Sequence, residues 1–98
     1  MLNSVTLIGK LAGRPVESDN NPAANITHKV ALDVENTDEQ NHAVIDICIW
    51  EPLAQTINEK YSEGTVVGIK GYLQDLHNQL FVVATRVSFM TPMEADND

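Results

Sequence analysis

The sequence predicts a small all-β protein, in which five strands bend into a barrel and one short helix lies between the third and fourth strands. Two observations support this fold class. Short runs of β-branched residues, which are typical of strands, recur along the 98 residues. Apolar residues at helical spacing stand out between two of these runs. Residues 1–90 are therefore expected to form one domain, and residues 91–98 a short acidic disordered tail.

A strand–helix–strand unit in the middle of the chain organises this fold. Residues 44–50 form an apolar, β-branched run that predicts the third strand. Pro52 is expected to stop that strand, and residues 53–61 carry apolar side chains at helical spacing. Gly64 is expected to end the helix as a left-handed cap, and the fourth strand follows at residues 65–73.

Three further strands flank this unit, and polar segments connect all five. The flanking strands are expected at residues 5–11, 25–34 and 80–89. The connections are expected to be a polar loop at residues 16–23, an acidic hairpin loop at residues 35–42 and a short turn at residues 75–79.

Side chains alternate between the two faces of a strand, so each strand should turn one set of residues toward the core. In the second strand, the set predicted to point inward is Ile26, Val30, Leu32 and Val34, with His28 in line. In the third strand, the inward set is Ile45, Ile47 and Ile49. The opposite face of the third strand should carry Val44, Asp46, Cys48 and Trp50.

Glycines inside the first and fourth strands indicate a sheet that coils tightly, because a strand glycine often marks a bend or bulge. They are Gly9, Gly68 and Gly71. A five-stranded Greek-key barrel with one helix between its third and fourth strands matches the OB-fold. Proteins of this fold bind oligonucleotides with one face of the strands and the flanking loops.

The charge balance argues against binding of nucleic acid. Fourteen acidic residues outnumber six basic ones, for a net charge of −8, and three of the acids lie in the last five residues. A protein that binds nucleic acid normally carries a basic surface, and the composition shows none. An alternative reading is therefore an OB-fold module that binds a basic protein partner, or an accessory replication factor with weak or lost DNA binding.

Other classes of function find little support in the residues. The three histidines have no spacing typical of metal ligands, and no nucleophile–base pair is evident, so neither a metal site, a cofactor nor an enzyme is predicted. No apolar run approaches the roughly 20 residues of a membrane helix. Cys48 is the only cysteine, which excludes an intrachain disulfide. A cytoplasmic location, with no membrane partner, is expected.

Four segments of the chain resemble bacterial single-stranded DNA-binding proteins, in the order that this family has them. They are residues 1–15, 46–54, 64–73 and 82–89. The resemblance implies an OB-fold that assembles into homo-oligomers, tetramers or dimers, and coats single-stranded DNA without strong sequence preference. It also implies a role in DNA replication, recombination or repair, nucleoid association, and replication or recombination proteins as possible partners.

The resemblance also implies which residues contact DNA. Trp50 occupies a position where the family places an aromatic that stacks on bases, and Tyr72 is a second candidate. The candidate phosphate partners are Lys10, Arg14, Lys29, Lys70 and Arg86. Composition alone favours Trp50 as barrel packing or a subunit contact, and it fits each cation equally well as an ordinary solvated side chain.

Several departures from the family predict weaker binding than in a typical relative. Val44 stands where relatives often carry an aromatic, and Asp46 places a carboxylate in the middle of the expected binding face. The loop at residues 35–42 is acidic, the turn at residues 75–79 is short, and the tail lacks the apolar tip that docks partner proteins. With five candidate cations at most, the salt dependence per protomer should be shallow.

Overall fold

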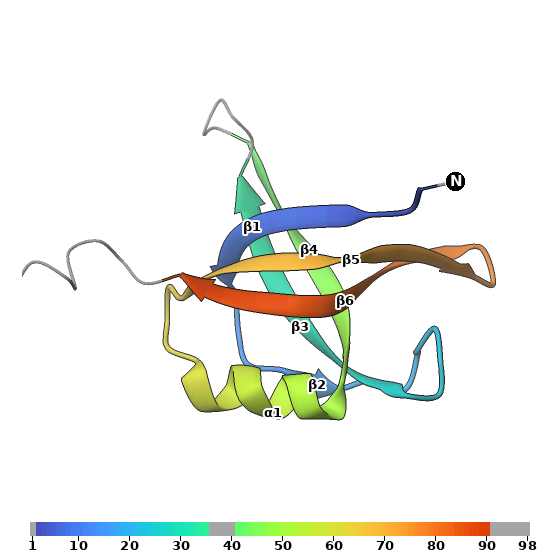
Figure 1. Cartoon of the computed structure of the whole chain (residues 1–98), viewed down its shortest axis with the longest axis horizontal. Coiled ribbons are helices and arrows are strands. Elements are labelled where there is room, and N and C mark those ends of the chain that lie inside the picture. Colours follow the sequence, from blue (N-terminus) through green and yellow to red (C-terminus); the bar gives the residue numbers. More distant parts are fainter. Residues whose placement is uncertain (1, 36–40, 91–98) are drawn as a thin grey trace, which may run out of the picture.

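Six strands and one helix follow one another in the structure, a computed structural model that describes residues 2–35 and 41–90. They are β1 (Val5–Leu11), β2 (Val16–Glu17), β3 (Ile26–Glu35), β4 (His42–Trp50), α1 (Glu51–Lys60), β5 (Val66–Leu76) and β6 (Gln79–Met90). The strands form one sheet in the order β1-β5-β6-β4-β3-β2, and further pairing of β1 with β3 closes it into a barrel (Figure 1). The predicted OB-fold is confirmed.

The structure has one more strand than predicted, the short β2, in a segment that was expected to be a polar loop. The helix predicted between the third and fourth strands therefore lies between β4 and β5. Val16 and Glu17 of β2 pair with Lys29 and His28 of β3. The segment that contains β2 runs past α1, which lies at one end of the barrel in Figure 1. A strand of only two residues, Val16 and Glu17, is too short to show a period in the sequence.

Two clusters of buried side chains hold the sheet together, one on each of its faces. The cluster inside the barrel contains Leu11, Val30, Leu32, Ile47, Ile49, Ala54, Ile57, Val67, Ile69, Val82 and Ala84. The second cluster contains Ile26, Cys48, Phe81 and Val83, with Ala23, Tyr72 and Leu76 packed against it. Because Cys48 alternates with Ile47 and Ile49, the second cluster lies on the outer face of the sheet.

Ile26 belongs to this outer cluster, so its predicted inward position is wrong. The ladder between β3 and β4 pairs Ile26 with Trp50 and His28 with Ile49, which leaves Thr27 as an extra residue on β3. A bulge of one residue reverses the face that every residue beyond it occupies. The predicted inward positions of Val30 and Leu32, on the other side of the bulge, are confirmed.

A second bulge lies where β5 and β6 cross the barrel. Lys70 pairs with Arg86 and Gly71 with Ala84, so Thr85 is the extra residue, and its hydroxyl donates to the Lys70 carbonyl oxygen at 3.2 Å. At Gly71 the neighbouring backbone approaches so closely that a Cβ would overlap the carbonyl oxygen of Val83. The tight coil predicted at Gly71 is thus a close backbone approach that glycine alone permits.

The helix begins and ends earlier than predicted. It starts at Glu51, directly after Trp50, and Pro52 lies in its first turn rather than stopping the strand. Proline fits there because the first amide groups of a helix have no partner within the helix. The helix ends at Lys60 and Tyr61 is extended, so Gly64, with φ of 84°, shapes the following turn and is not the cap.

The two hairpins extend further than predicted. β5 continues to Leu76 and β6 begins at Gln79, which leaves a two-residue turn of His77 and Asn78, both with positive φ as in a type I′ hairpin. β3 and β4 pair as far as Glu35 with His42. Residues 36–40 of the predicted acidic loop and the tail at residues 91–98 lie outside the described residues.

Candidate nucleic-acid interface

Trp50 and Tyr72 line one shallow groove on the outer face of the sheet. The groove is bordered by Asn25, Ile26, Trp50, Tyr72, Val83, Ala84 and Thr85. Its volume is about 240 Å³, below the roughly 300–1,000 Å³ of sites that hold drug-sized molecules. The groove is therefore suited to one planar group rather than to a large ligand.

The elements around Trp50 keep its ring accessible. Trp50 is the last residue of β4 and the N-cap of α1, so the chain turns away from the sheet immediately after it. Its side chain is 48% exposed, whereas Ile49 beside it is fully buried inside the barrel. Tyr72 is half-buried, because it is the cross-strand partner of Val83 and packs against the outer cluster. An exposed indole and a supported phenol thus share an apolar floor, an arrangement suited to stacking a nucleobase.

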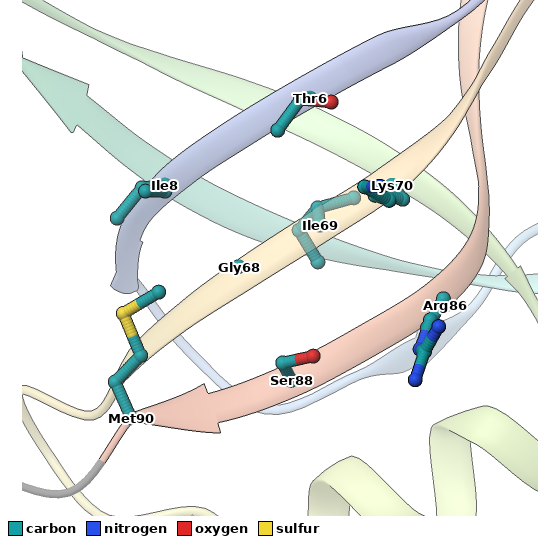
Figure 2. Close-up of a pocket in the computed structure, with 8 residues that line it drawn as sticks. All are labelled: Thr6, Ile8, Gly68, Ile69, Lys70, Arg86, Ser88 and Met90. Atoms are coloured by element: carbon teal, nitrogen blue, oxygen red, sulfur yellow. The ribbon is translucent and has the colours of Figure 1, made fainter.

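Lys70 and Arg86 form a cationic pair next to this groove. They are cross-strand partners on β5 and β6, and both are exposed. Figure 2 shows them on neighbouring strands at one end of a hollow whose other end is bordered by Ile8 and Met90. Lys70 is two residues from Tyr72 on the same face of β5, and Arg86 directly follows Thr85 of the groove.

Lys29 lies on the other side of the groove and has an acidic partner. Its Nζ is 3.7 Å from Oδ2 of Asp46, and the two side chains are 43% and 60% exposed. Both border a hollow that Cys48, Leu80 and Phe81 also line. Asp46 therefore lies on the outer face, as the sequence predicts, and Lys29 partly neutralises its charge.

Burial raises the pKa of the Cys48 thiol above its usual 9.0. The nearby Asp46 carboxylate raises that pKa further, and Lys29 opposes the increase. The thiol at the bottom of this hollow is therefore protonated and inert at neutral pH.

Arg14 and Lys10 lie away from the groove. Arg14 Nη1 donates to the main-chain oxygen of Asn58 at 2.8 Å and to its Oδ1 at 2.6 Å, and its guanidinium lies 4.8 Å from the centre of the Tyr61 ring. Arg14 thus anchors the segment after β1 to the helix. Lys10 is the cross-strand partner of Asp33 and borders a hollow that also contains Glu35.

The structure therefore brings together five of the seven residues predicted to contact DNA. Trp50, Tyr72, Lys29, Lys70 and Arg86 follow one outer face from β3 to β5, whereas Lys10 and Arg14 do not belong to it. Asn25 and Thr85 also border the groove, and sequence reasoning missed both. Thr85 carries the bulge, for which strand alternation leaves no signal.

Within residues 2–35 and 41–90, no three potential metal ligands among histidine, cysteine, aspartate and glutamate come together. In the same part of the chain, no helix has the length and hydropathy required to cross a membrane.

Known proteins share both the sequence pattern and the fold. The model of the single-strand binding protein family matches residues 2–80. The dimeric N-terminal domain of PriB from Thermoanaerobacter tencongensis has a TM-score of 0.71 at 26% identity, over 92% of this chain and 98% of that one. No curated protein matches the chain significantly.

Two further solved structures are similar at lower identity. The single-stranded DNA binding protein of Thermus aquaticus has a TM-score of 0.68 at 23% identity, over 93% of this chain and 41% of that one. The mitochondrial single-stranded DNA binding protein Rim1 of S. cerevisiae has a TM-score of 0.72 at 13% identity, over 91% of this chain and 94% of that one. At such identities the likeness shows the fold alone.

Proposed function

Because the chain belongs to the single-strand binding protein family, we propose that it coats single-stranded DNA in replication, recombination or repair, without catalysis. DNA runs along the outer face of β3, β4, β6 and β5. One base stacks in the groove of Trp50 and Tyr72, and Lys29, Lys70 and Arg86 contact phosphates. The observation that carries this proposal is an exposed indole in an apolar groove, with cations on both sides.

The expected strength follows from these contacts. Stacking a base on an aromatic side chain contributes about 1–3 kcal/mol. Each phosphate neutralised on a single strand adds about 0.7 to the slope of log K against log salt, so three cations set an upper bound of about 2 on the slope per protomer. Charges further than about 10 Å from the path are screened at 0.1 M salt, so the net acidity of the chain weakens this binding without preventing it.

Assembly into a homo-oligomer would multiply these contacts along one strand of DNA. Val5 to Gly9 of β1 pair with β5 on one side, while β3 pairs with β1 only at Lys10 and Leu11. The other edge of β1 therefore offers unpaired backbone groups to a second chain. A dimer or a tetramer, acting in the cytoplasm with replication or recombination proteins, is part of the proposal, and light scattering measures its mass.

Titration with thymidine oligomers, followed by the fluorescence of Trp50, tests the proposal. Trp50 is the only tryptophan, so a base that stacks on its ring should quench the signal. Trp50→Ala should lower the affinity about 5- to 150-fold, which corresponds to one lost stacking contact. Absence of both quenching and retention of the oligomer at low salt would contradict the proposal and favour binding of a basic protein.

A further inference from the structure

We propose that Asp46 is a built-in competitor for the phosphate site of Lys29, so that it limits the affinity of this face for DNA. The inference rests on the proposed function of the same face. It assigns a role in limiting affinity to a carboxylate that lies on the face proposed to bind DNA.

The register of β3 and β4 places the two side chains together. Lys29 is the cross-strand partner of Cys48, and Asp46 is the partner of Ala31. The two charges are therefore diagonal neighbours on the outer face, a spacing that long side chains bridge. The separation of 3.7 Å between Lys29 Nζ and Asp46 Oδ2, with both side chains exposed, describes a weak pair that opens readily.

The Lys29–Asp46 pair lies on the proposed path of a DNA strand that has one base stacked on Trp50. Cys48 is two residues before Trp50 on the same face of β4, and Val83 is the neighbour of both Cys48 and Tyr72. The floor of the Lys29 hollow is thus continuous with the floor of the aromatic groove. A phosphate that follows the stacked base meets Lys29 with the Asp46 carboxylate already bound to it.

Displacing that carboxylate has two consequences. The phosphate replaces one anion by another, so Lys29 adds little net attraction. The released carboxylate then faces the DNA backbone and repels it, with a Coulomb energy that depends on the short distance. Asp46 should therefore reduce both the affinity and the contribution of Lys29 to the salt slope.

Asp46→Asn removes the charge and keeps the size of the side chain. Binding of a fluorescein-labelled thymidine oligomer, measured by anisotropy from low to moderate salt, should become about fivefold tighter at low salt. Its salt slope should steepen by about 0.7, the value for one additional phosphate contact. Asp75→Asn makes the same chemical change on β5, at an exposed position that alternation directs away from Tyr72, and should bind like the wild type.

A double-mutant cycle with Lys29→Ala separates competition from general repulsion. In the wild type Lys29→Ala should change binding little, whereas in Asp46→Asn it should remove the additional slope and the part of the gain that comes from the freed lysine. An equal gain from Asp46→Asn in the absence of Lys29, or equal effects of Asp46→Asn and Asp75→Asn, would overturn the inference. Asp46→Ser serves as a second neutral variant if the amide perturbs folding, which thermal unfolding reports.

The outcomes distinguish this inference from the proposed function. Wild-type protein that binds the oligomer, together with an unchanged Asp46→Asn variant, overturns the inference alone. If neither protein binds at low salt, the proposed function fails and the inference fails with it.

Discussion

The cations on the two sides of the aromatic groove differ in whether they have an acidic partner. On β5 and β6, Lys70 and Arg86 are direct cross-strand neighbours, and neither has an ion pair within the described residues. On β3 and β4, Lys29 pairs with Asp46, with 3.7 Å between Nζ and Oδ2.

Like charges opposite each other destabilise a sheet, whereas paired charges do not. Within the described residues, the β5–β6 region keeps a positive site without an ion-pair partner beside the groove, whereas Asp46 partly offsets the charge of Lys29 on the other side. The difference teaches that an acidic chain can still present a local binding site for phosphate, because within residues 2–35 and 41–90 no carboxylate lies in ion-pair range of Lys70 or Arg86.

The largest expected effect concerns the bulge that places the β5–β6 cations beside Tyr72. Gly71→Ala puts a Cβ into the Val83 carbonyl group, and rigid backbone cannot move away as a side chain could. We expect a loss of stability of about 3 kcal/mol, measured by urea unfolding. Gly13→Ala is the control, since nothing lies within 4 Å of its Cβ position. Equal stability of the two variants would refute the close approach.

The second prediction compares the two regions directly. Replacing Lys70 and Arg86 together by glutamine should lower the slope of log K against log salt by about 1.4, twice the contribution of one phosphate. Lys29→Gln should change the slope much less, because Asp46 already occupies Lys29. Salt titrations of the three proteins measure both values. Equal slopes for Lys29→Gln and the double variant would show that the two regions do not differ.

The smallest effect concerns the thiol beneath the Lys29–Asp46 pair. The pKa of Cys48 is raised in the folded protein, so the protonated thiol stabilises the fold. That stabilisation is complete below the unfolded pKa of about 9.0 and is lost as the pH rises through the folded value. Unfolding between pH 8 and pH 10.5 should therefore show a steeper loss of stability for wild type than for Cys48→Ala, which lacks the titrating group. Parallel curves for the two proteins would contradict the raised pKa.

Sequence reasoning recovered most of the strands because their period of two is a local property. Ile47 and Ile49 face the barrel interior and Trp50 faces outward, as the alternation along β4 predicts. The family was also recognisable from four ordered segments, and the match over residues 2–80, which includes all but Met1 of the first three, confirms the family. Bulges escaped prediction, since an extra residue such as Thr27 or Thr85 is defined only against the partner strand.

Which residues belong to the candidate site is decided mainly by contacts between segments that are distant in the sequence. Arg14 and Lys29 look alike in the sequence as isolated cations. Arg14 is held by Asn58, 44 residues away, while Lys29 meets Asp46 through the register of a hairpin. No local pattern distinguishes a cation that braces the fold from one that faces the groove.

The sequence by itself determined that this chain forms a bent barrel with a lone indole at the end of a central strand, because hydrophobic alternation specifies which faces are buried. Only the tertiary structure decided that Tyr72 shares a groove with this indole. It also decided that Lys70 and Arg86 have no ion-pair partner among the described residues, while Lys29 pairs with a carboxylate. These outcomes depend on strand register and on two bulges, which are set by long-range pairing rather than by neighbouring residues.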